Sequence, residues 1–130
     1  MSEIYLMTTI TKRLTGRKMQ TFYDQNGLSG VLCTLARGTA TSEMLNYFGL
    51  EATEKIVMMS VVTDNTWKQV KRGLEEQVQI DVPGRGIAFL IPLSSVGGRK
   101  VLEFFTDGQE FQIEKESAMK DTKYELIVVI

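Results

Sequence analysis

The chain has 130 residues, of which 15 are Lys or Arg and 16 are Asp or Glu, so its formal net charge is −1. No overall field therefore favours nucleic acid or an anionic membrane. Apolar residues make up 43% of the chain and charged residues 24%, which argues against disorder and, at this length, predicts one domain with a single core. With no histidine and one cysteine, the usual ligand sets for zinc, copper or haem are absent, and no nucleophile has an imidazole partner.

Neither a membrane helix nor a signal peptide is expected. The longest apolar runs, 56–62 and 87–93, fall well short of the roughly 20 residues that a membrane helix needs. Acidic Glu3 stands where a signal peptide would be basic. We therefore expect a cytoplasmic protein without membrane insertion. Cys33 lies in an apolar pattern and is expected to be a small buried side chain rather than a redox thiol.

The first part of the chain predicts a strand, a helix and a strand. Residues 4–10 are rich in β-branched and aromatic residues, which is typical of a strand. From Thr11 the apolar residues recur at helical spacing, and Asn26-Gly27 provides a C-terminal stop. Residues 28–38 predict a second strand, in which Gly30 indicates a bulge.

A long segment, 38–54, separates this part from the next. It is small and polar apart from MLNYFGL, residues 44–50, which could form one short helical turn. A loop of this length inside a compact domain is usually functional or mobile.

The pattern then repeats. Residues 55–63 predict a third strand, whose nearly continuous apolarity suggests that both of its faces are covered. Asp64 or Asn65 can cap the helix that follows. The apolar stripe of that helix consists of Trp67, Val70, Leu74 and Val78. Residues 87–93 predict a fourth strand, which ends at Pro92 because proline cannot donate to a strand ladder.

Strand–helix–strand repeated twice predicts a ferredoxin-like α+β fold, the split βαβ arrangement, with a four-stranded antiparallel sheet and both helices on one face. The other face is then bare, and because large exposed apolar patches are unfavourable in water, we expect an oligomer.

The C-terminal residues suggest an extension to this domain. Residues 124–130, YELIVVI, resemble 4–10, and residues 111–117 form another alternating segment. Either a second copy of the unit begins near Lys123, or the last strand adds to the edge of the sheet. We accordingly divide the chain into a domain at 1–108 and a C-terminal extension at 109–130.

Three glycine turns carry basic residues. In PGRG, residues 83–86, two glycines leave backbone N–H groups free to form an anion-binding nest, and Arg85 adds charge. The alternative is a plain turn, and the dinucleotide pattern GxGxxG is incomplete because Phe89 occupies its sixth position. The other two turns are Gly97-Gly98 with Arg99 and Lys100, and Arg37 with Gly38 and Thr39. The sheet could bring the three together within one subunit or between subunits.

The order of elements and the segment PGRGIAFLIPLSSVGG, residues 83–98, resemble the PII signal-transduction proteins of nitrogen regulation, and more closely their divergent PII-like relatives. The resemblance covers about residues 3–100. It implies a non-catalytic homotrimer that needs no cofactor and binds ATP, ADP, AMP or cyclic AMP as an effector in the clefts between subunits. Loop 38–54 stands where the family carries its T-loop, which controls a transporter or an enzyme.

The resemblance carries over residue by residue, with departures. Ile87 stands where a phosphate-contacting lysine would be, and Gly98 stands near the place of an arginine. Gly84 and Gly86 match the phosphate-cradling glycines, but Arg85 replaces the acid between them. The ligand-binding residues that the resemblance implies are Arg37, Gly38, Thr39, Gly84, Arg85, Gly86, Arg99 and Lys100.

Two functions follow from these residues. One is a regulator that senses a nucleotide or another small anion and signals through 38–54. The other is a protein-interaction module that has lost nucleotide binding, which Ile87 and Gly98 favour. Its partner would dock on the apolar loop residues Met44, Tyr47, Phe48 and Leu50. An enzyme is not supported, because no acid, base or nucleophile can be assigned. Nucleic-acid binding is not supported either, because the aromatic residues do not interleave with basic ones.

Overall fold

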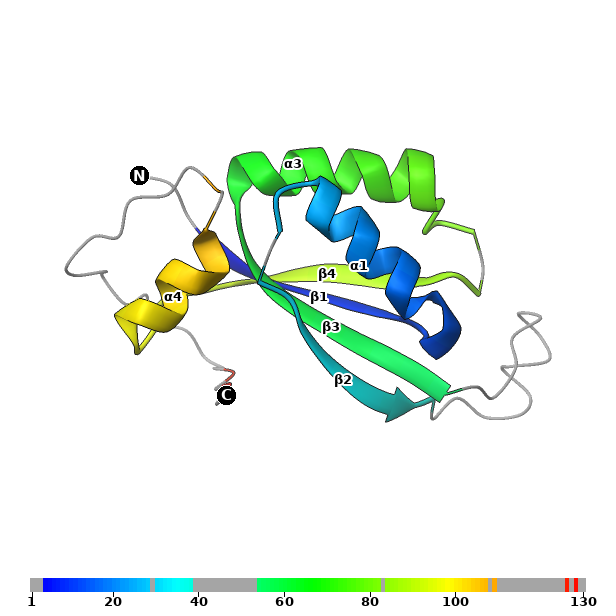
Figure 1. Ribbon diagram of the computed structural model, residues 1–130, viewed down its shortest axis with the longest axis horizontal. Helices are drawn as coiled ribbons and strands as arrows, with labels where there is room; N and C mark the ends of the chain where they lie inside the picture. The colour runs from blue at the N-terminus through cyan, green and yellow to red at the C-terminus, as the bar shows by residue number, and fades with distance from the viewer. Residues whose placement is uncertain are drawn as a thin grey trace.

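The computed structural model describes residues 4–28, 30–38, 54–82, 84–107, 109, 126 and 128. They form a twisted four-stranded sheet with α1 and α3 side by side against one face (Figure 1). A further helix, α4, lies apart from these two at one end of the sheet. The strands are β1 (Ile4–Lys12), β2 (Leu32–Arg37), β3 (Glu54–Thr63) and β4 (Gly86–Pro92).

The strands are arranged in the order β2-β3-β1-β4, and every neighbouring pair is antiparallel. The central pair, β1 and β3, runs in register from Ile4 opposite Thr63 to Lys12 opposite Lys55. This is the predicted split βαβ topology, and the ferredoxin-like fold class is confirmed.

Two helical segments cover one face of the sheet, which we call the helix face. The first is the short 3-10 turn η1 (Arg13–Thr15) followed by α1 (Gly16–Gln25). The second is α3 (Asp64–Gly73), which continues as a π-helical turn, η2 (Leu74–Val78). Their apolar sides and the sheet enclose the main core, made of Met7, Met19, Phe22, Tyr23, Leu28, Met58, Val62, Val70 and Leu74.

Two local predictions need correction. The cap of α3 is Thr63 rather than Asp64 or Asn65, because its hydroxyl accepts a hydrogen bond from the Thr66 N–H at 3.3 Å. Gly30 is not a bulge, since β2 begins only at Leu32. Gly30 instead allows α4 to come close, because a Cβ at this position would lie 3.1 Å from the Phe104 carbonyl oxygen.

Cys33 is exposed, so the prediction that it is buried was wrong. It lies on β2, an edge strand, and its register partner Met58 places it on the helix face. The polar Gln20 of α1 lies beside it, with its Nε2 3.4 Å from the sulfur. An apolar sequence pattern cannot distinguish an edge strand from a central one.

The sequence did not predict the helix α4 (Arg99–Thr106). Leu102 and Phe105 of this helix are buried against Val61 of β3, with Ile4, Leu32 and Leu93 packed around them. The second face of the sheet, which we call the outer face, is therefore covered at one end. Toward the other end, Ile87 and Phe89 of β4 are 55% and 38% exposed.

Several predictions fall on residues outside the described ranges. They are the short helical turn within 38–54, the strands at 111–117 and 124–130, and the division at residue 108. Leu126 and Val128 are described, and both side chains are exposed. None of the described helices combines the length and the apolarity that crossing a bilayer requires.

Candidate functional site

Four strand ends meet at one end of the sheet, which we call the loop end. β2 ends there at Arg37, opposite Glu54, the first residue of β3. β1 ends there at Lys12, opposite Lys55. β4 begins there at Gly86, opposite Thr11. Two of the three basic turns, at 37–39 and 84–86, therefore lie at the same end of the sheet, although Thr39 is outside the described residues.

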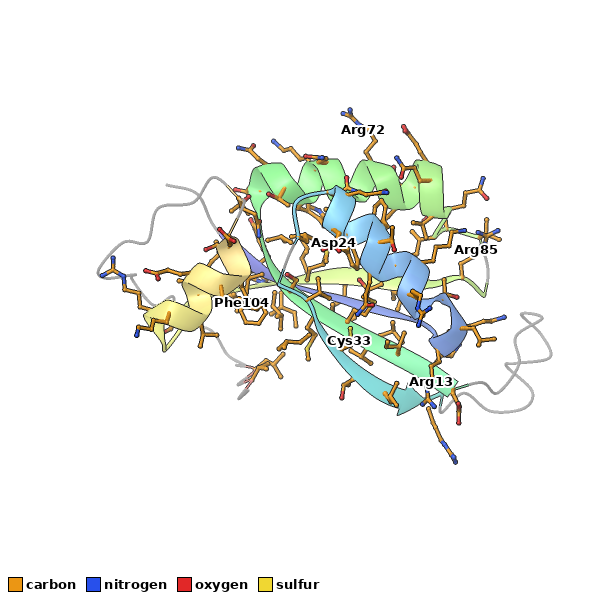
Figure 2. The ribbon with its side chains drawn as sticks, viewed as in Figure 1. Arg13, Asp24, Cys33, Arg72, Arg85 and Phe104 are labelled. Carbon is orange, nitrogen blue, oxygen red and sulfur yellow. The ribbon has the colours of Figure 1, made fainter. Side chains whose placement is uncertain are left out.

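Within one chain these two turns remain apart. β2 and β4 are the two edges of the sheet, with β3 and β1 between them. Three strand spacings of about 4.8 Å separate them by about 14 Å. Figure 2 shows Arg85 beside the start of β4, well away from the end of β2. A ligand of nucleotide size that touched both turns in one chain would have to lie across β1 and β3.

The third basic turn lies elsewhere. Arg99 and Lys100 begin α4, which packs at the opposite end of the sheet from the loop end (Figure 2). The Nε of Arg99 lies 3.3 Å from a carboxylate oxygen of Glu103, one helical turn later. Gly98 precedes the helix with φ 91° and ψ 86°. Arg99 and Lys100 therefore cannot join the other two turns within one chain.

The PGRG turn is held by bonds of its own. The Arg85 N–H donates to the Val82 carbonyl at 3.1 Å, and its guanidinium donates to the Val78 carbonyl at 3.2 Å. Gly84 and Gly86 have φ values of 87° and 144°, which side chains rarely adopt. A Cβ on Gly86 would lie 2.5 Å from the Ile10 carbonyl oxygen. Gly86 is thus required for the pairing of β4 with β1, and its substitution would not test anion binding cleanly.

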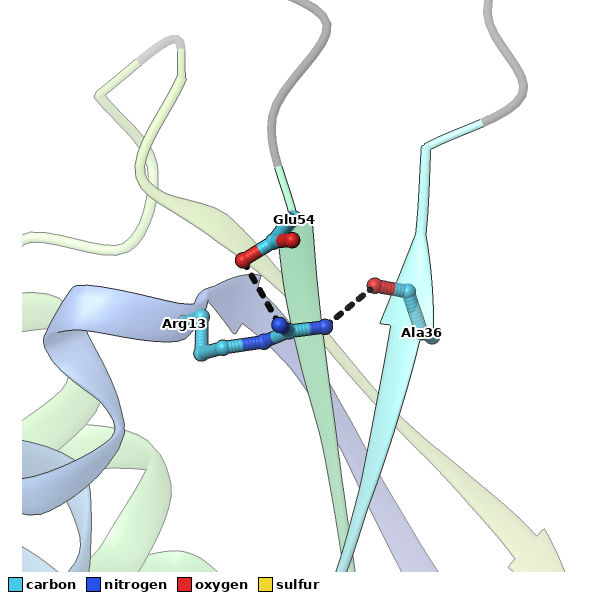
Figure 3. Close-up of polar contacts among 3 residues, drawn as sticks. All are labelled: Arg13, Ala36 and Glu54. Carbon is cyan, nitrogen blue, oxygen red and sulfur yellow. Dashed lines mark hydrogen bonds and ion pairs between the residues drawn. The ribbon is translucent and has the colours of Figure 1, made fainter.

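Arg13 is the loop-end residue that the sequence did not identify. Its Nη1 lies 2.6 Å from a carboxylate oxygen of Glu54, and its Nη2 donates to the Ala36 carbonyl at 3.3 Å (Figure 3). The guanidinium thus reaches from the end of β1 across β3 to β2. No local pattern connects residues 13 and 54, because they are 41 positions apart.

The loop end is rich in positive charge. Lys12, Arg37 and Lys55 lie at the strand ends, and Arg13 and Arg85 adjoin them. Within the described residues, no cluster of three or more His, Cys, Asp or Glu side chains could hold a metal ion. The arrangement suits an anionic ligand better than a cation.

Comparisons with known proteins give matches in structure alone. No family model and no curated protein matches the chain. Arabidopsis thaliana PII bound to citrate has a TM-score of 0.56 and 20% identity, over 76% of this chain and 85% of that one. CPII from Thiomonas intermedia K12, a nitrogen regulatory PII-like protein bound to ADP, AMP and bicarbonate, has a TM-score of 0.55 and 12% identity, over 70% and 90%.

A third match is the GlnK–ATP complex of B. subtilis, with a TM-score of 0.51 and 16% identity, over 71% of this chain and 83% of that one. The chain has the fold of the PII proteins. The resemblance predicted from the sequence is thus confirmed at the level of the fold. The 38–54 segment connects β2 and β3, which are adjacent antiparallel strands of the sheet.

Proposed function

We propose that the chain is a non-catalytic PII-like regulatory protein that binds a small anionic effector, an adenylyl nucleotide, between the subunits of a homotrimer. The observation that carries the proposal is the placement of two basic turns on opposite edges of one sheet at the same end. When three copies turn their outer faces toward a common axis, one edge of each copy meets the other edge of its neighbour. A cleft between subunits could then combine turns that a single chain keeps apart.

The outer face of the sheet supports the oligomer. Ile87 and Phe89 are exposed there, and Val57 and Met59 on β3 are only half-buried. Apolar side chains gathered on one face of a sheet favour contact with another copy, because water is then excluded from them.

In this proposal Arg37, Gly38 and Thr39 come from one subunit, and Gly84, Arg85 and Gly86 come from the next. Arg99 and Lys100 could contribute only from a neighbouring copy. The 38–54 segment would carry the signal to a regulated transporter or enzyme in the cytoplasm. The neighbours in complex with ADP and AMP, and with ATP, support the choice of an adenylyl nucleotide.

The test is titration calorimetry of the full chain with ATP, ADP, AMP and cyclic AMP, with the oligomeric state measured on the same sample. We expect saturable binding of one nucleotide at about one site per subunit. Arg37→Ala and Arg85→Ala should each weaken it by about tenfold or more, the effect of losing a charge-assisted hydrogen bond. Arg72→Ala, an exposed arginine of α3, is the matched control. The absence of heat from a folded trimer would refute nucleotide binding.

The alternative, an interaction module without a nucleotide site, is favoured by three observations. Ile87 places an exposed apolar side chain beside the glycine turn, and the Arg85 guanidinium is already bonded to a carbonyl. Leu14 and Leu35, near the loop end, are 99% and 64% exposed. This alternative predicts a protein partner that is recovered by pull-down and lost when residues 39–53, which include Met44, Tyr47, Phe48 and Leu50, are deleted.

A further inference from the structure

The contacts of Arg13 connect the two strands from which the 38–54 segment departs. Ala36 is the second-last residue of β2, and Glu54 is the first residue of β3. One guanidinium binds both of them, although β1 has no direct pairing with β2. We call Arg13, Ala36 and Glu54 the Arg13 bridge (Figure 3).

The bridge differs from an ordinary surface ion pair. The side chains of Arg13 and Glu54 are 32% and 57% exposed, so the pair is screened by solvent and is weak as an attraction. However, the rigid planar guanidinium holds the Glu54 carboxylate of β3 and the Ala36 carbonyl of β2 in a fixed position relative to each other. Its effect is therefore on the geometry of the strand ends rather than on overall stability.

The Arg13 bridge is also incompletely satisfied. The Nε of Arg13 is buried and has no hydrogen-bond partner, and within the described residues it is the single side-chain polar atom in this condition. A buried donor without a partner is unfavourable. Glu54 accepts from the Nη1 of Arg13 and leaves the Nε–H without an acceptor. An anion that accepted from both the Nε–H and a terminal N–H would remove the cost of the unpaired donor.

Glu54 itself lies between two arginines. Arg13 binds its carboxylate, and Arg37 stands directly opposite it in the β2–β3 ladder. Residues directly opposite in an antiparallel pair present their side chains on the same face. An anion that approaches Arg37 therefore approaches the groups that hold Glu54.

We propose that Arg13 is a positioning residue that sets the geometry of β2 and β3 at the loop end, and that a bound anion competes with Glu54 for it. The first half stands on the contacts alone, and the second half rests on the proposed function. The competition would give an effector a direct mechanical effect on the two strand ends that flank 38–54.

The first half is tested by amide hydrogen exchange, without any anion, on Arg13→Ala and on the control Arg72→Ala. We expect the amides of residues 37 and 54–56 to exchange roughly three- to tenfold faster in Arg13→Ala. Residues 58–62 should not change, because a general loss of stability would accelerate all of these amides. Arg13→Lys should lie in between, since an ammonium cannot span both acceptors in one geometry. Equal exchange at 37 and 54–56 in Arg13→Ala and Arg72→Ala would overturn the positioning role.

The second half is tested by ATP titration of Glu54→Gln, which keeps the shape and an acceptor but removes the competing charge. ATP should bind about two- to fivefold more tightly to Glu54→Gln than to the wild type, and more weakly to Arg13→Ala. Unchanged affinity in Glu54→Gln would overturn the competition. If the wild type binds no nucleotide, the proposed function fails, whereas the exchange comparison still decides the positioning role.

Discussion

Tyr23 of α1 and Thr9 of β1 share a hydrogen bond between their hydroxyl groups inside the core. Both residues have 0% exposure, so neither hydroxyl can turn to water for another partner. Hydrogen bonds are directional and apolar contacts are not. This bond therefore fixes the orientation of the first helix relative to the central strand.

Burial raises the pKa of Tyr23 from 10.0 to about 12, and the hydrogen bond with Thr9 acts in the opposite direction. The folded protein then keeps this proton where the unfolded chain has lost it. Its contribution to stability is fully present below pH 10 and is lost as the pH rises toward 12. The loss amounts to at most about 3 kcal/mol, at roughly 1.4 kcal/mol for each pKa unit.

Urea unfolding between pH 9 and about 11.5 measures this effect when the wild type is compared with Tyr23→Phe. The variant leaves the Thr9 hydroxyl unpaired and should lose roughly 1–3 kcal/mol at neutral pH. Adding Thr9→Val should restore part of that loss. Above pH 10 the gap between the wild type and Tyr23→Phe should narrow. A gap that stays constant with pH would contradict a raised pKa.

At the scale of the element, α4 depends on a glycine that is distant in sequence. A Cβ on Gly30 would lie within 3.1–3.2 Å of atoms of Phe104 and Phe105, including the backbone. Gly30→Val should therefore push α4 away from the outer face and lower the free energy of unfolding by roughly 1–3 kcal/mol. Gly97→Val is the control, because a Cβ there meets nothing within 4 Å. Equal urea midpoints for the two variants would argue against this contact.

The long periodic elements could be predicted because their burial pattern is local. The stripe that includes Val70 and Leu74 predicts α3 directly, and both of these residues are buried. The helix α4 could not be predicted in this way. Its eight residues are too few to show a clear helical period, and the preceding Gly98 indicates a turn. Its apolar residues Leu102 and Phe105 are buried by packing against Val61, and the position of Val61 depends on the pairing of the whole sheet.

The candidate site was predictable only in part. Sequence patterns located the basic turns at Arg37 and Arg85, and strand pairing places both at the loop end. The two turns lie on opposite edges because of the strand order of the sheet. The positions of the turns in the sequence do not reveal that order. The contact between Arg13 and Glu54 depends on packing over 41 positions and has no local signature.

At the scale of the whole molecule, the outer face predicts self-association. Phe89→Glu places a charge among the apolar side chains of that face, and a buried charge without a partner is strongly unfavourable. We expect light scattering coupled to size exclusion to find a trimer for the wild type and a monomer for Phe89→Glu. Val82→Glu is the control, because Val82 is 44% exposed and lies in the turn before β4 rather than in the sheet. A monomeric wild type would overturn the trimer.

The strand order also has a consequence for folding during synthesis. In the part of the chain that the structure describes, the strand partners of β1 are β3 and β4, and both follow β2 in the sequence. β2 and β3 are the one consecutive pair of strands that are also neighbours in the described sheet, so their pairing closes the shortest connection between paired strands. Closing a flexible loop costs entropy that grows slowly with its length. During synthesis we therefore expect β2 and β3 to pair before β1 joins them, so the length of the connection proposed to carry the signal also sets the entropy cost of the first strand pair.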